Sequence, residues 1–279
     1  MSILRLIRRF RQARKAQVIG ICRFSYPALG GFQIVHDSPD QRADFLYAKD
    51  RLDERFRLFE AFTLPSLRAQ TDQNFTFLIV IGDDFPPDRL AQLTALTKDM
   101  PQVVIKAYPP GRHRTVMADA INSVRLPDRL SIQFRHDDDD AVAVQFVARL
   151  RRTVRQCYPL LLTSHVMAID YTCGFNASGG PDGIAMQEVR RLFLGVAFAV
   201  VARPDTNLTV MNFTHFDIWK HMPTITRNDP NMWVRGANDF NDSGESLNQD
   251  LAPLTPEQEG LFQRRFGITA DRVRAIWRR

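Results

Sequence analysis

A run of four aspartates, Asp137 to Asp140, constrains the fold of this chain more than any other feature. The run follows a short apolar segment, residues 130–135, that is typical of a β-strand. Adjacent carboxylates repel one another, so at the end of a buried strand they need a cation beside them. A divalent metal that also carries phosphate oxygens meets this need. The alternative is a solvated acidic loop, which is what most short charge runs are.

The first 150 residues alternate between strand-like and helix-like segments. Strands are predicted at 17–24, 74–82, 102–107 and 130–135, and helices at 50–69, 88–99, 113–122 and 142–150. This rhythm predicts an α/β fold with a mostly parallel central sheet flanked by helices. Open α/β sheets bind ligands at the carboxyl ends of their strands. Asp83 and Asp84 end the second strand, so we expect them at the same edge as the aspartate run.

The second half of the chain is less regular. Strands are predicted at 160–164, 166–171 and 192–202, turns at 174–183, and one or two helices within 255–279. The chain therefore reads as one compact domain, in which residues 17–150 form one half and residues 151–279 the other. A basic segment, residues 1–16, precedes both halves.

The charge balance favours an anionic partner. The 279 residues carry a formal net charge of +6, which suits a phosphorylated ligand, an anionic glycan or an anionic membrane surface. The sequence contains no zinc-finger spacing, ribonucleoprotein motif or Gly-x-x-Gly clamp, so nucleic acid is not predicted as a partner. Residues 1–16 place Ile3, Leu6, Ile7 and Phe10 on one helical face among arginines. Such a segment lies on anionic lipid or packs on its own domain, and both interpretations stay open.

Cysteine usage and hydropathy bear on the compartment. Cys22, Cys157 and Cys173 are odd in number and widely spaced, which predicts neither a disulfide framework nor a zinc site. No apolar run approaches the ~18 residues that a membrane span needs. The N-terminus lacks the apolar core and cleavage site of a signal peptide. We therefore expect a cytoplasmic protein, with peripheral contact at the inner membrane face left open.

Three basic residues stand at the ends of predicted elements. Arg23 ends the first strand, and His113 and Arg114 begin the helix at 113–122. Cations at a helix N-terminus oppose the helix dipole, and a nearby anionic ligand would relieve that conflict. These residues are therefore candidates for contact with phosphate, with solvated side chains as the alternative.

One strand ends in Asp83-Asp84, and a later one ends in Asp137-x-Asp139-Asp140 before a helix. This order resembles the nucleotide-sugar half of GT-A glycosyltransferases over about residues 17–150. The resemblance implies a GT-A-like fold whose Asp-x-Asp motif binds Mn²⁺ or Mg²⁺ together with the diphosphate of a nucleotide-sugar donor.

The resemblance also implies roles for individual residues. The metal is expected at Asp137, Asp139 and Asp140, and the donor at Arg23, Asp83, Asp84, His113, Arg114, Asp137 and Asp138. Alternate side chains of an extended segment share a side, so Asp137 and Asp139 are expected to face the metal and diphosphate. Asp138 is expected to point away, and a register shift by one residue would exchange the two pairs.

Several further stretches, spread over most of the chain, are similar to a bacterial family described as rhamnosyltransferases. They are residues 23–26, 57–60, 64–70, 82–84, 133–142 and 241–243. The similarity implies transfer of a sugar, rhamnose by the family's name, to a glycan or glycolipid acceptor, with residues 151–279 as the acceptor-side half. The resemblance implies a His in many relatives where this chain has Asn238, and if that His helps to bind metal, this chain lacks a late metal ligand.

An inverting transfer needs a base that deprotonates the acceptor hydroxyl. Asp217, flanked by His215 and Trp219, is the first candidate for this base, and Asp239 and Asp242 are the alternatives.

Two other classes of function stay open. Metal-dependent phosphohydrolases and nucleotidyltransferases also carry acids at strand ends, although the six histidines here form no His-x-His pair. A non-catalytic module that binds polysaccharide or lipid on a degenerate enzyme fold is the other, and it would make the aspartate run dispensable.

Overall fold

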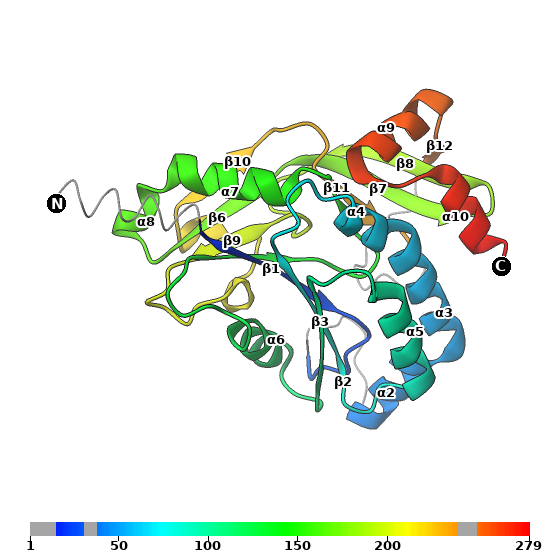
Figure 1. The fold of residues 1–279 in the computed structure, drawn as a ribbon, viewed down its shortest axis with the longest axis horizontal. Helices are drawn as coiled ribbons and strands as arrows, with labels where there is room; N and C mark the ends of the chain where they lie inside the picture. Colours follow the sequence, from blue (N-terminus) through cyan, green and yellow to red (C-terminus); the bar gives the residue numbers. More distant parts are fainter. Residues whose placement is uncertain (1–14, 31–37, 239–249) are drawn as a thin grey trace.

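The computed structural model describes residues 15–30, 38–238 and 250–279. At its centre lies a seven-stranded sheet in the order β10-β6-β9-β4-β1-β2-β3 (Figure 1). The strands are β1 (Gln17–Arg23), β2 (Thr76–Gly82), β3 (Val103–Tyr108), β4 (Ser131–Arg135), β6 (Val166–Tyr171), β9 (Ala199–Ala202) and β10 (Thr224–Arg227). Neighbouring strands are parallel except at β9, which runs antiparallel between β4 and β6. The predicted α/β fold with a mostly parallel sheet is confirmed.

Helices and loops cover both faces of this sheet. The helices are α2 (Pro39–Tyr47), α3 (Lys49–Leu58), α4 (Leu64–Arg68), α5 (Pro87–Thr97), α6 (His113–Asn122), α7 (Phe146–Cys157), α8 (Leu160–Thr163), α9 (Pro256–Phe266) and α10 (Ala270–Trp277). Along β2, Phe77, Ile79 and Ile81 pack on the face covered by α3, α5 and α7. Leu78 and Val80 pack on the opposite face, against α6. This alternation explains why a strand covered on both faces is apolar throughout.

The predicted helix at 50–69 is continuous but irregular. Between α3 and α4 the backbone forms a π-helical turn, Phe59–Thr63. Pro65 lies in the first turn of α4, directly after the π-helical turn. A proline has no backbone N–H to donate, so the continuous helix lacks one hydrogen bond of its ladder at this position.

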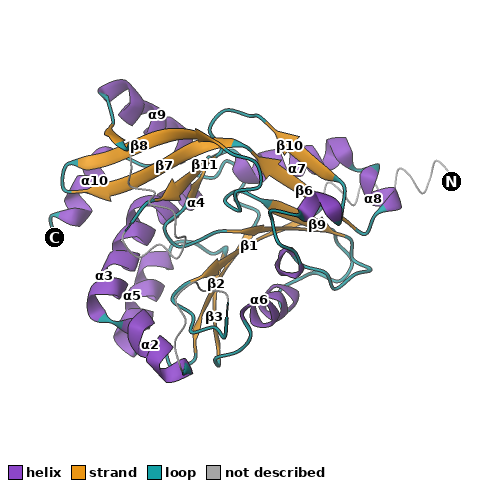
Figure 2. Ribbon diagram, turned by 180° about the vertical axis from the view of Figure 1, so that it is seen from behind, coloured by secondary structure: helices purple, strands orange, loops and turns teal. Residues whose placement is uncertain are grey.

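A second, five-stranded sheet has the order β12-β8-β7-β11-β5 (Figure 2). Its strands are β5 (Ala141–Val142), β7 (Cys173–Gly180), β8 (Gly183–Arg190), β11 (Trp233–Gly236) and β12 (Ala252–Pro253). Phe175 of β7 packs against Phe262 and Phe266 of α9. Since β4 ends at Arg135 and β5 begins at Ala141, the aspartate run is the link between the two sheets.

Two predicted elements next to the aspartate run differ in the structure. The helix expected at 142–150 begins only at Phe146, because Ala141 and Val142 pair with β11. The next backbone groups are engaged by other segments, as the Val144 amide donates to the Arg265 carbonyl at 2.8 Å. The expected strand at 160–164 is the short helix α8, which follows Pro159 directly.

Two predictions for the middle of the second half were also wrong. The turn region at 174–183 is a hairpin of β7 and β8, with Gly183 in the left-handed region at φ +114°. The strand expected at 192–202 is confined to Ala199–Ala202. The residues before it form a loop, since Phe193, Gly195 and Ala197 have positive φ angles that a strand does not accommodate.

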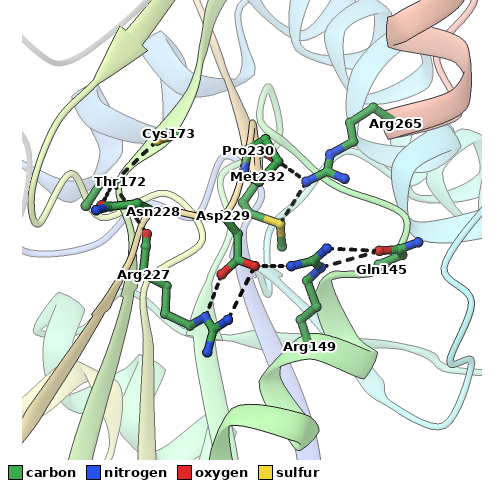
Figure 3. A network of polar contacts seen from close by, with 10 residues as sticks. All are labelled: Gln145, Arg149, Thr172, Cys173, Arg227, Asn228, Asp229, Pro230, Met232 and Arg265. Atoms are coloured by element: carbon green, nitrogen blue, oxygen red, sulfur yellow. Dashed lines mark hydrogen bonds and ion pairs between the residues drawn. The ribbon is translucent and has the colours of Figure 1, made fainter.

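Polar contacts fix the segment that connects β10 to β11 (Figure 3). The carboxylate of Asp229 accepts hydrogen bonds from Arg227 and from Arg149 of α7, and these arginines lower its pKa. Arg265 of α9 donates to the Pro230 carbonyl. Helices α7 and α9 therefore hold the segment that leads into β11, the strand beside the aspartate run.

Candidate functional site

The four aspartates have different surroundings. Asp138, Asp139 and Asp140 are buried, whereas Asp137 is exposed. The guanidinium of Arg55, from α3, donates to Asp138 at 3.0 Å and to Asp139 at 3.2 Å. The cation that the run requires is therefore supplied in part by the protein itself. Asp138, which was also a candidate for contact with the donor, points into the protein against Arg55.

The end of β11 holds the other two buried aspartates. The Asn238 side chain donates to Asp139 at 2.7 Å, and the Gly236 amide donates to Asp140 at 3.2 Å. A Cβ atom at Gly236 would lie 2.5 Å from the Asp139 carbonyl oxygen, so only glycine fits there. Burial, and then the negative charges of Asp139 and Asp137, raise the pKa of Asp140 well above its usual value.

Buried arginines of α2 and α3 brace the loops around the site. One turn before Arg55, Arg51 donates to the Ser25 hydroxyl at 3.1 Å, in the loop that follows β1. Arg42 donates to the Ala28 carbonyl in the same loop. These arginines were not predicted. The available signal was the spacing of Arg51 and Arg55, which places both on the apolar face of α3 beside Leu52.

A basic cluster lies at the same edge of the sheet. It contains the predicted Arg23 at the end of β1 and the predicted His113 and Arg114 at the start of α6. Burial, and then the charges of Arg23, Arg135 and Arg114, lower the pKa of His113 to about 3. Arg135, at the end of β4, had no predicted role; burial lowers its pKa to about 10, and Asp137 opposes that shift. The structure thus brings four basic residues together beside the exposed aspartate.

Backbone hydrogen bonds hold this cluster together. The Leu29 amide donates to the Gly111 carbonyl at 2.8 Å, and the His113 amide donates to the Leu29 carbonyl at 3.2 Å. The loop after β1 is therefore joined to the start of α6, which explains why residues 90 positions apart in the sequence meet.

Asp83 and Asp84 follow β2 and are exposed at the same edge. The Asp84 carboxylate accepts a hydrogen bond of 2.7 Å from the Tyr47 hydroxyl. Burial, and then this carboxylate, raise the pKa of Tyr47. Burial, and to a lesser extent the charge of Asp83, raise the pKa of Tyr26, whose hydroxyl donates to the Pro109 carbonyl. These two acids therefore lie with the loops that flank the basic cluster.

The residues after β9 supply a histidine near Arg135 and Asp137. Burial is the main cause of the lowered pKa of His215. The charges of Arg135 and Arg235 lower this pKa further, and the charge of Asp137 opposes the shift. Its Nδ1 lies 2.5 Å from the Phe193 carbonyl oxygen. Because a carbonyl only accepts, Nδ1 carries the proton and Nε2 keeps its lone pair.

The predicted bases are placed differently. Asp217 is exposed and directly precedes the 3₁₀ turn Ile218–Lys220, and its carboxylate pairs with Lys220 at 2.9 Å. Asp239 and Asp242 lie outside the described residues, as does most of the basic segment 1–16. Within the described ranges no three His, Cys, Asp or Glu side chains form a group that could hold a metal ion. No helix there is long and apolar enough to cross a membrane.

A family model described as "Putative rhamnosyl transferase" matches residues 17–250. The chain belongs to this family. The match includes β1, the aspartate run and β11, so all the site residues above fall inside the family region. Membership places the chain among glycosyltransferases by class and confirms the similarity expected from the sequence.

Solved structures give more distant similarities. TarS 1–349 of S. aureus, solved in complex with UDP-GlcNAc, is 11% identical with a TM-score of 0.42, over 87% of this chain and 63% of that one. Its complex with UDP has 11% identity and a TM-score of 0.43, over 79% and 60%. A "putative nucleotide-diphospho-sugar transferase" of Desulfovibrio desulfuricans G20 is 12% identical with a TM-score of 0.40, over 94% of each chain. The chain thus spans less than two thirds of the TarS 1–349 chains, and no curated protein matches it.

Proposed function

We propose that this protein transfers a sugar, rhamnose by the description of its family, from a nucleotide-diphosphate donor to a hydroxyl of a glycan or glycolipid. The observation that carries the proposal is the basic cluster of Arg23, His113, Arg114 and Arg135 beside Asp137. Arginines bind phosphate oxygens in pairs, and cations aimed at a leaving diphosphate stabilise the charge that develops on it.

Each side of the site has a proposed task. The arginines at the ends of β1 and β4 bind the diphosphate, while Asp83 and Asp84 face the base or ribose. Arg55 holds Asp138 and Asp139 in place and keeps their repulsion from distorting the run. The donor side is thereby built before any ligand arrives, which reduces the entropic cost of orienting the donor.

A divalent cation, Mn²⁺ or Mg²⁺, is the proposed cofactor. Carboxylate oxygens suit such hard cations, and the exposed Asp137 together with Asp139 would hold the ion. The described residues supply fewer than three grouped ligands, so donor phosphates and water would complete its coordination. When bound, the ion neutralises charge on the leaving nucleoside diphosphate.

For the base we propose His215 in preference to Asp217. Its Nδ1 proton is engaged by the Phe193 carbonyl, and burial keeps the imidazole neutral near pH 7, so Nε2 can accept the proton of an acceptor hydroxyl. The Asp217 carboxylate instead forms an ion pair with Lys220 on an exposed turn.

Nucleotide binding tests the donor side directly. We expect UDP or dTDP with MnCl₂ to raise the melting temperature of the wild type; at 100 times Kd the gain is about 2.7 kcal/mol in the free energy of unfolding. Asp137→Asn should remove the part of the stabilisation that depends on MnCl₂, and Arg135→Met should abolish binding. Arg129→Met is the matched control, because Arg129 is exposed and lies just before the amino end of β4, whereas the site is at the carboxyl end. Absence of nucleotide binding by the wild type would refute the proposal, and release of free phosphate would identify a phosphohydrolase instead.

Turnover tests the base. His215→Gln should lower kcat about 100-fold or more while donor affinity is kept, since general base catalysis contributes about that much. Asp217→Asn should keep its kcat at saturating acceptor concentration. The reverse pattern would make Asp217 the base, as the sequence first suggested.

A further inference from the structure

Three large apolar side chains stand out on the surface. In the part of the chain that the structure describes, the most exposed ones are Leu192, Phe216 and Trp219, with 56, 59 and 59% of their surface exposed. They come from two segments, the loop 191–198 and the turn 214–221. Exposed apolar side chains gathered in this way mark a binding surface more often than scattered ones do.

The two segments are tied together and anchored. The His215 ring bonds to the Phe193 carbonyl, and it lies on the ring of Phe216 with centroids 3.9 Å apart. Between Phe216 and Trp219, Ile218 is fully buried in the core below the turn. The turn is therefore fixed from beneath while its aromatic rings face outward.

The loop is held in an unfavourable conformation. Phe193 and Ala197 both have φ of +55°, a region that residues with a side chain rarely adopt. The buried carboxylate of Asp170 accepts from the Phe193 amide at 3.2 Å and helps to impose that conformation. Such strain is concentrated at functional sites, where the fold over-determines it.

The position of the loop connects this surface to the site. Ala199, the first residue of β9, pairs with Phe134 near the end of β4 and with Ile169 near the end of β6. The loop 191–198 therefore enters the sheet at the edge where the aspartate run begins. His215 links the turn to the site. Its ring packs on the ring of Phe216, and it lies near enough to Asp137 for that charge to act on its pKa.

The geometry points to Leu192, Phe216 and Trp219 as an acceptor platform that binds the sugar rings of a glycan. This inference rests on the proposed glycosyl transfer and adds the place and chemistry of acceptor recognition. The C–H face of a pyranose packs on an aromatic ring, and the rim of the platform supplies polar partners for its hydroxyls. That rim is the half-exposed pair Asp217–Lys220, whose ammonium lies 5.4 Å from the Trp219 ring centre.

A glycan fits these residues better than a lipid surface does. An aromatic ring beside a paired carboxylate and ammonium offers both stacking and hydrogen bonds, as a hydroxyl-rich ligand requires. Insertion into a bilayer would desolvate the Asp217 carboxylate, which is costly. Asp217 thereby gains a role in binding rather than in proton transfer.

The tryptophans allow a direct test. Trp233 is buried and Trp277 is half-buried, so in a Trp277→Phe background the exposed Trp219 is the reporter on the surface. The probes are a rhamnose trisaccharide and chitotriose, titrated with UDP and MnCl₂ present, and vesicles of phosphatidylglycerol. We expect at least one saccharide to change the Trp219 emission saturably and to protect it from acrylamide. Phe216→Ala should weaken that affinity at least fivefold, while Leu126→Ala, another exposed leucine, should leave it unchanged.

Each outcome separates the platform from the donor site. If nucleotide binds but no saccharide changes the emission, or if Phe216→Ala has no effect, the platform is refuted and the donor site stands. A blue shift with vesicles and none with saccharide would also refute it, in favour of membrane contact. If the wild type binds no nucleotide, the proposed transfer itself fails first.

Discussion

The two sides of the aspartate run are built in opposite ways. On the proposed donor side, a buried arginine of α3 neutralises buried carboxylates, and parallel strands place the residues that we propose to bind phosphate. On the proposed acceptor side, a loop with positive φ angles at Phe193 and Ala197 lies beside a turn that carries exposed aromatic rings. The proposed donor side is therefore braced by buried charge pairs before binding, whereas the proposed acceptor side consists of loops that display apolar surface.

Asp138 and Asp170 show this difference within the sheet itself. Both are buried carboxylates near strand ends, one after β4 and one in β6. Asp138 is paired with Arg55, whereas Asp170 is held by the Phe193 amide and has a pKa raised by burial to about 6. The fold compensates a charge on the donor side and tolerates a poorly compensated one on the acceptor side.

Removing Arg55 should have the largest effect on stability. Arg55→Met leaves Asp138 and Asp139 buried without their guanidinium, which costs about 3–5 kcal/mol in the free energy of unfolding. Denaturant unfolding measures this loss. Arg57→Met, two residues along and solvent-facing in an ion pair with Glu54, should cost less than about 1 kcal/mol.

A double variant makes the Arg55 test specific. Adding Asp138→Asn to Arg55→Met should recover part of the loss, because the uncompensated charge is then removed. If the two losses simply add, the arginine contributes through packing and not through charge, and the donor side is not electrostatically braced.

Replacing Asp170 should stabilise the protein in a pH-dependent way. The folded pKa of about 6 lies above the unfolded value of 3.8, so between these values the folded state binds the extra proton. Stability from this group is therefore present at low pH and is lost as pH rises through 6. At pH 7.5, Asp170→Asn should gain about 3 kcal/mol in the free energy of unfolding, with little difference at pH 4.

Unfolding curves at the two pH values check the Asp170 prediction. An equal effect at pH 4 and 7.5 would show that the carboxylate is not ionised in the fold. Asp128→Asn, at an exposed position, should change stability by less than about 0.5 kcal/mol.

The same contrast explains what the sequence could predict. Apolar runs indicated β1 to β4 and placed Asp83, Asp84 and the aspartate run at one edge, while Arg23, His113 and Arg114 were predicted only as candidates for contact with phosphate. Period-two and helical patterns carry that information locally. On the acceptor side the apolar run 192–202 looked like a strand throughout, because a positive φ at Phe193 or Ala197 leaves no signal in residue type.

Tertiary pairing was the other limit. Nothing local in the sequence shows that Arg55 reaches Asp138, 83 residues away, or that β11 pairs with β5 and brings Asn238 to Asp139. Asp217 was favoured as a base for its neighbours in sequence, whereas the geometry that matters is the hydrogen bond between His215 and Phe193.

Gly236 offers the smallest but most local test of the proposed donor side. In Gly236→Ala the new methyl group would lie 2.5 Å from the Asp139 carbonyl oxygen and 2.8 Å from its Cβ, so the strand and the aspartate run must separate. Overpacking of this kind costs about 2 kcal/mol in the free energy of unfolding. Because the shift displaces Asp139, nucleotide affinity should fall as well, which calorimetry measures. Gly180→Ala, where a Cβ meets nothing within 4 Å, should change neither quantity. If Gly236→Ala binds nucleotide like the wild type, the donor side adapts as readily as the acceptor side, and the contrast between them is lost.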